Sequence, residues 1–288
     1  MTEVFPDEDY RFQLRFERGT IGEFFRPTPG HEKLLAERRH WLHSDPHTYS
    51  ALLPDGVPLL EETIESARAE QVLPADFDAL HQSINPTTHQ SSFDQSTTPS
   101  LLHSSLVELG ASWEPDFLLL RPDAASQIVL VGGCVCFPSS WSLAEKMGHP
   151  IEMIHGVVPG LNPAIGNQIH GFLTKLRPGT AWLRANWGLT RSPELNQHPE
   201  RKLAKLDSNV RLEDIWLRIE RQMLAALPKS HGVLFAIRIA MHPLVEIQQN
   251  PEIAPRLRRA LETMSEAMAQ YKGIASARAG IISLLRDA

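Results

Sequence analysis

Apolar residues recur at helical spacing through much of the first hundred positions. Within residues 31–43 and again within residues 59–67, large apolar side chains return every three or four positions, which predicts two amphipathic helices. Residues 85–100, NPTTHQSSFDQSTTPS, are polar and offer almost nothing to bury, so we expect a flexible loop there. We therefore predict an N-terminal helical region over about residues 1–110.

The middle of the chain changes to short apolar runs. Four such runs are predicted as strands: residues 117–121, 127–137, 182–187 and 232–241. Pro122-Asp123 is a turn signal between the first two runs, so these are expected to form a hairpin. Gly132-Gly133 inside the second run predicts a bulge or a close approach of two backbones.

Helical patterns surround these strands. Predicted helices cover residues 142–148, 162–176 and 212–227, followed by two C-terminal helices, the first with Leu257, Leu261, Met264 and Met268 along one face. Ser142 and Glu145 form a capping box, and Asn162 before Pro163 is typical of a helix start. The pattern predicts an α+β fold, in which one mainly antiparallel sheet is flanked by N-terminal and C-terminal helices.

Composition excludes several classes of function. The 288 residues carry a net charge of −6, without the clustered basic excess that a nucleic-acid-binding protein shows. No stretch approaches the ~20 apolar residues of a membrane span. The acidic N-terminus lacks the apolar segment of a signal peptide, and two cysteines make no disulfide framework. We expect a cytoplasmic protein that binds neither nucleic acid nor membrane.

His155 is the histidine with the most distinctive surroundings. It follows an apolar run and precedes Gly156 and the pair Pro159-Gly160, so a stiff loop presents it beside an apolar surface. A neutral imidazole in that setting suits a proximal haem ligand, although a histidine that ties down loop backbone fits the same residues. Cys136 is the rival iron ligand, but a cysteine in an apolar strand is more often a small core residue.

Three cationic residues and a tryptophan have two interpretations each. Arg238 interrupts an apolar strand, and Arg221 is placed on the polar side of the predicted helix beside Glu220. Either arginine could hold an anion such as a haem propionate or reduced oxygen, or could form a helix-to-strand salt bridge. Lys146 shares this ambiguity, with helix capping as its alternative. Trp187 fits the protein core as well as a cofactor pocket.

Several motifs occur together in a specific order. They are CFPSSW at residues 136–141, then Leu143, Glu145 and Lys146, IHGVVPG at 154–160, Asn186-Trp187, Glu220-Arg221-Gln222, FAIR at 235–238 and Tyr271-Lys272-Gly273. Taken together, they resemble the haem-dependent oxidative N-demethylase family over roughly residues 100–275. Two positions depart from that pattern: Glu114-Pro115-Asp116 before the first strand, and Ile239-Ala240 after Arg238.

The resemblance implies a single PAS-like domain over residues 1–288 that binds haem b. It implies oxygen-dependent demethylation of a small secondary amine such as dimethylamine, with release of formaldehyde. Electrons would come from NADPH through a separate reductase that carries flavin and an iron–sulfur centre. By motif position, His155 would ligate iron, Lys146 and Trp187 would contact the cofactor, and Arg221 and Arg238 would be catalytic. The alternatives are a haem-based gas or redox sensor and a haemless relative.

Overall fold

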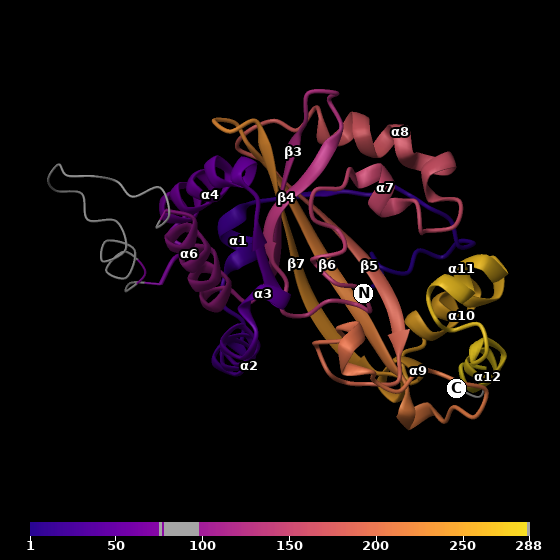
Figure 1. The fold of residues 1–288 in the computed structure, drawn as a ribbon. Helices are drawn as coiled ribbons and strands as arrows, with labels where there is room; N and C mark the ends of the chain where they lie inside the picture. Colours follow the sequence, from indigo (N-terminus) through magenta and orange to yellow (C-terminus); the bar gives the residue numbers. More distant parts are fainter. Residues whose placement is uncertain (75–76, 78–97, 287–288) are drawn as a thin grey trace, which may run out of the picture.

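A seven-stranded antiparallel sheet forms the centre of the protein. The computed structural model describes residues 1–74, 77 and 98–286, so most of the loop expected at residues 85–100 lies outside the described residues. The strands are β1 (Glu17–Gly19), β2 (Ser50–Leu52), β3 (Asp116–Pro122), β4 (Ile128–Cys134), β5 (Ala181–Thr190), β6 (Trp216–Leu227) and β7 (Gly232–Pro243). Their order across the sheet is β1-β5-β6-β7-β3-β4-β2 (Figure 1).

Helices cover both sides of this sheet. On one side are α1 (Ile21–Phe25), α2 (His31–Ser44), α3 (Pro46–Tyr49), α4 (Val57–Ala69) and α6 (Thr98–Ser112) (Figure 1). On the other side are α7 (Ile151–His155), α8 (Leu161–Leu173), α9 (Leu244–Gln248), α10 (Ile253–Thr263), α11 (Glu266–Tyr271) and α12 (Arg278–Leu284). The expected α+β class and antiparallel sheet are confirmed.

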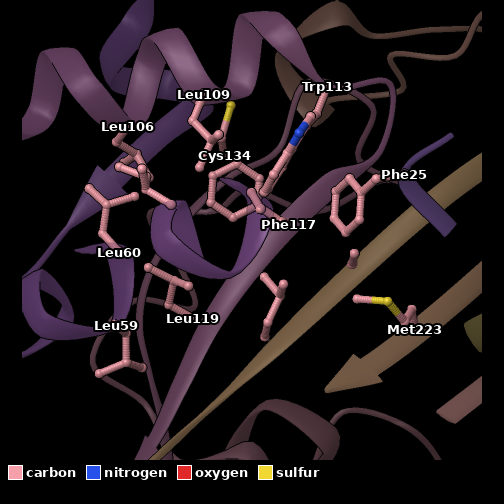
Figure 2. Close-up of a cluster of buried hydrophobic side chains, with 14 of the residues drawn as sticks. Phe25, Leu59, Leu60, Leu106, Leu109, Trp113, Phe117, Leu119, Cys134 and Met223 are labelled. Atoms are coloured by element: carbon pink, nitrogen blue, oxygen red, sulfur yellow. The ribbon is translucent and has the colours of Figure 1, made fainter. Parts of the chain in front are cut away.

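The largest hydrophobic cluster joins the sheet to the N-terminal helices. Leu60 of α4 and Leu109 of α6 lie on the side of the cluster that faces Phe117 on β3, and Leu59 of α4 lies below them near Leu119 (Figure 2). Each of these leucines is at most 1% exposed. Burying one such side chain stabilises the fold by about 1.5–3 kcal/mol. Cys134 belongs to the same cluster, so this packing holds β3 and β4 against the helices.

The expected close backbone approach occurs where β3 meets β4. The register shifts between Leu119 and Leu120, as a bulge requires. A Cβ atom at Gly133 would lie 2.5 Å from the carbonyl oxygen of Phe117. Only glycine fits there without moving one of the strands, which confirms the interpretation of the glycine pair.

Three predicted helices need correction. Residues 216–227 form strand β6, which pairs with β7 along its whole length and with β5 over residues 216–225, and only Leu212–Asp214 makes a short 3-10 turn. The spacing of apolar residues predicted a helix wrongly, because residues four apart share a face in a strand as well as in a helix. The capping-box segment at 142–148 contains turns but no helix. Helix α8 begins after Gly160, so Asn162 lies inside it and donates to the carbonyl of Glu152 at 2.8 Å.

Both ends of the chain contain more secondary-structure elements than the sequence predicted. The N-terminal region contains strands β1 and β2 in addition to its helices. Four helices rather than two follow β7, because Met264 is extended and Ser265 caps a new helix by accepting from the backbone N–H of Met268. Among the described residues, no helix is both long and apolar enough to cross a membrane.

Candidate functional site

A cavity of about 710 Å³ lies on the side of the sheet that carries α7 and α8. The N-terminal segment of residues 3–17, strands β5 and β6, and helices α7, α8 and α11 contribute to its wall. Its apolar lining includes Phe16, Ile151, Ile165, Ile169, Phe172, Leu173, Trp187, Leu224 and Phe235. Phe16 stacks on Phe172 with ring centroids 4.0 Å apart, which fixes the N-terminal segment against α8.

His155 enters this cavity as the last residue of α7. Its ring makes no hydrogen bond or ion pair with any residue in the described part of the chain. Burial lowers the pKa of His155 to about 4, and the nearby charges of Arg184 and Lys146 act in the same direction. The imidazole is therefore neutral at pH 7 and keeps a nitrogen lone pair free for a ligand.

Arg184 lies in the same cavity without a bonded partner among the described residues. It is on β5, directly opposite Gln222 on β6. Burial lowers its pKa, and the charge of Glu220 opposes that effect only in part. A guanidinium has five donors, and leaving them partly desolvated and unpaired is unfavourable unless an anion binds. The arrangement is suited to holding an acidic group.

The end of α11 supplies a second cation. Lys272 donates from Nζ to the carbonyl oxygen of Trp187 at 2.6 Å, and Nζ lies 4.9 Å from the centre of the Trp187 ring. Burial lowers the pKa of Lys272 to about 8, and Glu220 opposes this change. Trp187 is 8% exposed and contacts Phe5 with ring centroids 5.2 Å apart. Lysine and indole thus form one wall.

Glu220 brings three separated motifs together. Its carboxylate accepts from Ser139 Oγ at 2.7 Å, from Gln222 Nε2 at 3.2 Å and from Asn186 Nδ2 at 3.3 Å. It also favours the charged form of Lys272. Residues that are more than 80 positions apart therefore form one polar network beside the cavity, because β5 and β6 are paired in register there.

The structure brings together only part of the predicted site. His155, Trp187 and Arg221 line the cavity, whereas Arg238 and Lys146 do not. Arg221 is at the rim, donates to a Glu3 carboxylate oxygen at 2.7 Å, and has a 60% exposed side chain. It is on strand β6 and not on a helix.

Arg238 belongs to a separate ion cluster. Its guanidinium binds Glu114 and donates to the carbonyl of Phe24 at 2.6 Å. Glu114 also accepts from the backbone N–H of Thr28 at 2.7 Å and contacts His31 Nδ1 at 2.9 Å. The cluster ties β7 and the segment before β3 to the chain around α1 and α2. The partner of Arg238 is thus Glu114, and not Glu220, which was the salt-bridge alternative considered for the two arginines.

The remaining candidates also lie outside the cavity lining. Lys146 is in the turn before α7, and its backbone N–H donates to the carbonyl of Leu143 at 2.9 Å. The positive charge of Lys146 helps to lower the pKa of His155. Cys136 is fully buried in the largest cluster as a free thiol whose pKa burial raises, so its interpretation as a core residue is confirmed. Ile239 packs against the same cluster.

Sequence analysis missed Arg184, Gln222 and Lys272 as cavity residues. The available signal was alternation along β5, since Arg184 lies two positions from Trp182 and therefore shares its face. Gln222 and Lys272 stand in the motifs that carried the resemblance, but no role had been attached to them. Pairing of β5 with β6 and docking of α11 bring them into the cavity, and neither is visible in local spacing.

The side chains present fit a haem group. No set of three or more histidine, cysteine or acidic residues in the described part of the chain could hold a bare metal ion. A single neutral imidazole beside a group of apolar side chains, with Arg184 lacking a bonded partner in the described part of the chain, instead fits an iron carried by a macrocycle with acidic substituents. The chain matches the family described as haem-dependent oxidative N-demethylase, alpha subunit-like, over residues 23–282. That family name indicates haem dependence, oxidative N-demethylation and partner subunits, and this chain belongs to it.

Proposed function

We propose that this protein binds haem b in the cavity beside α7 and oxidises an N-methyl group of a small secondary amine such as dimethylamine. Formaldehyde and the demethylated amine would be the products, and O₂ the oxidant. Electrons would come from a separate NADPH-linked reductase with flavin and iron–sulfur centres. The observation that carries the proposal is His155, a neutral imidazole without a protein partner in the described chain, facing an apolar cavity of about 710 Å³.

Each side chain around the cavity has a distinct task in this proposal. His155 would hold the iron, and haem, when bound, supplies the activation of oxygen. Arg184 and Arg221 would offer guanidinium donors to the haem propionates and would stabilise negative charge on the oxidant. Trp187 and Phe172, which line the cavity, would provide apolar surface for the macrocycle and keep water away from it.

Two further residues act from outside the cavity. Lys146 contributes positive charge that helps to keep His155 neutral. Arg238, although it was expected to be catalytic, is proposed as a positioning residue: it anchors β7 next to Arg221, its directly paired neighbour on β6. The proposal also keeps two earlier expectations. The PAS-like haem domain that spans the chain rests on the resemblance, and the cytoplasmic location rests on composition.

The first experiment is a visible absorption spectrum of the protein purified from haem-supplied cells. We expect a Soret band that shifts with dithionite and shifts again with carbon monoxide. His155→Ala should lose most of the bound haem or change both spectra, because it removes the ligand. The matched control is His149→Ala, since His149 lies six positions earlier and outside the cavity lining. A His155→Ala protein with unchanged haem content and spectra would refute the ligand assignment.

A second experiment separates catalysis from sensing. The haem-loaded protein is mixed with dimethylamine, NADPH and a flavin and iron–sulfur reductase, and formaldehyde and NADPH consumption are measured together. Stoichiometric formaldehyde supports the demethylase. A normal spectrum with no amine-dependent NADPH consumption across secondary amines would instead favour a haem-based gas or redox sensor without turnover.

A further inference from the structure

Lys272 is held in place by the way α11 ends. Gly273 has φ +68°, a left-handed conformation that glycine adopts without strain. The backbone N–H groups of Lys272 and Ile274 donate to the carbonyls of Met268 and Ala269 at 2.9 Å each, which closes the last turn of the helix. This turn fixes the direction of the lysine stem toward β5, so Nζ reaches the Trp187 carbonyl. The motif Tyr271-Lys272-Gly273 therefore places one primary amine in the cavity wall.

This amine differs from an ordinary surface lysine in its surroundings. It has no ion pair with a carboxylate in the described part of the chain, and its one hydrogen bond is to a neutral carbonyl. The charged group that acts on it is Glu220 on β6. The cavity that it lines also carries other titratable side chains, which are Glu3, Glu8, Asp9, Tyr10, Glu17, Arg184 and the adjacent Tyr271. Burial is the larger influence on the pKa of Lys272, which falls to about 8, while Glu220 acts in the opposite direction.

We propose that Lys272 is a covalent capture site for small aldehydes inside the cavity. This inference rests on the proposed function, under which formaldehyde is formed in the same cavity. Lys272 lines that cavity, so an aldehyde released there has this amine in the wall around it.

The chemistry needs no oxidant or reductant. The neutral amine attacks the carbonyl carbon, a C–N bond forms, and a proton moves from nitrogen to oxygen to give a hydroxymethylamine. Loss of water from that adduct gives an imine, and addition of water reverses the sequence and releases the aldehyde. Only the neutral amine has the lone pair required for the first step, and desolvation is a known means of supplying it.

The expected selectivity follows from the fraction of neutral amine. At pH 7, a pKa of about 8 leaves roughly a tenth of Lys272 neutral, against about 0.03% for a lysine at its usual 10.5. That is a ratio of roughly 300, and lower basicity reduces the intrinsic reactivity of the amine, as it does for thiols. The net expectation is labelling of Lys272 on the order of tenfold faster than labelling of an exposed lysine.

The test labels the full-length, haem-loaded protein with formaldehyde and sodium cyanoborohydride. The reductant converts each imine to a stable N-methyl group, and peptide mass spectrometry measures the rate at each lysine. Lys229 is the internal control, because it is exposed and its hydrogen bond to Glu65 raises its pKa. We expect methylation of Lys272 first at pH 7, with a rate that rises with pH and levels off near pH 8. Methylation of Lys229 should keep rising toward pH 10.

A second variant makes the result specific to this environment. Glu220→Gln removes the carboxylate that favours charged Lys272, so labelling of Lys272 at pH 7 should become faster while Lys229 is unchanged. Labelling of Lys272 no faster than Lys229 would overturn the proposal. So would labelling confined to haem-free protein, because the working enzyme would then shield the amine. Neither result depends on turnover, whereas loss of haem binding alone would reject the proposed function and leave the lysine chemistry intact.

Discussion

The buried ion pair between Arg38 and Asp116 provides the sharpest test of how this fold is held together. The two side chains are 0% and 2% exposed, and Arg38 Nη1 lies 2.6 Å from Asp116 Oδ1. The same carboxylate accepts from the backbone N–H of Cys136 at 2.7 Å and of Phe137 at 3.0 Å. Arg38 also donates from Nε to the carbonyl of Gly110 at 2.6 Å. This ion pair thus links α2, α6, β3 and the segment after β4.

Asp116→Asn keeps the shape of the side chain and removes its charge. Arg38 then remains buried without a counter-charge, and the two backbone donors lose a strong acceptor. Breaking a buried pair from one side costs about 3–5 kcal/mol. At roughly 2–4 °C per kcal/mol for a chain of this size, the melting temperature should fall by roughly 6–20 °C.

The assays are urea unfolding of haem-free protein, which gives the free energy of unfolding, and thermal unfolding, which gives the melting temperature. Both are followed by tryptophan fluorescence and far-ultraviolet circular dichroism. Glu262→Gln is the matched control, because its pair with Arg286 is exposed and is worth about 0–1 kcal/mol. Arg38→Met should be as harmful as Asp116→Asn, and the double variant should lose much less than the sum of the two. A loss below about 1 kcal/mol for Asp116→Asn, or additive single effects, would refute the reasoning.

Three further outcomes follow from the contacts above. Gly133→Ala should destabilise by about 1–3 kcal/mol in urea unfolding because its Cβ would meet a strand carbonyl, whereas Gly188→Ala, with open space around it, should change stability by less than about 1 kcal/mol. Burial opposes ionisation of Glu114, but its hydrogen bonds and Arg238 lower its pKa on balance. Its stabilisation is therefore present above about pH 4.5 and lost as pH falls, and Glu114→Gln should flatten the acid side of a stability–pH curve. Arg184→Met should stabilise haem-free protein by about 1 kcal/mol yet weaken hemin binding, whereas Arg221→Met, at an exposed position, should leave stability within about 0.5 kcal/mol.

The sequence predicted those elements in which only one period fits. Residues 232–241 contain GVLFAIRIAM, too short and too rich in β-branched residues for a core helix, and they form β7. The prediction for the segment that forms β6 was wrong because Ile215, Ile219 and Met223 are spaced four apart. This spacing fits the helical period and the strand period equally well. The long pairing of β6 with β5 and β7 decides the outcome, and that pairing is a property of distant segments.

The same limit applies to the candidate site. His155 was found from its own neighbours, because the apolar run before it and the glycine after it are local features. Arg238 was placed with it because it interrupts an apolar strand and stands in a family motif, and the structure ties Arg238 to Glu114 instead. Arg184 had no local signal beyond alternation, since its place opposite Gln222 depends on the register between two strands. The order of the motifs thus identified the family. Strand pairing and helix docking decide which of the motif residues line the cavity and which support the fold.

The unpaired state of Arg184 and His155 is itself an argument about what the cavity holds. Elsewhere in the described chain, deeply buried cations have partners: Arg38 has Asp116, and Arg218 donates to the carbonyl of Phe137. Around the cavity, in contrast, the partly desolvated guanidinium of Arg184 and the neutral imidazole of His155 have no bonded partner among the residues that the structure describes. Unpaired, partly desolvated groups lower the stability of the ligand-free protein. A ligand that carries both a metal and acidic groups would pair with them, and its binding would therefore stabilise the protein. Haem has both, and a small amine alone has neither.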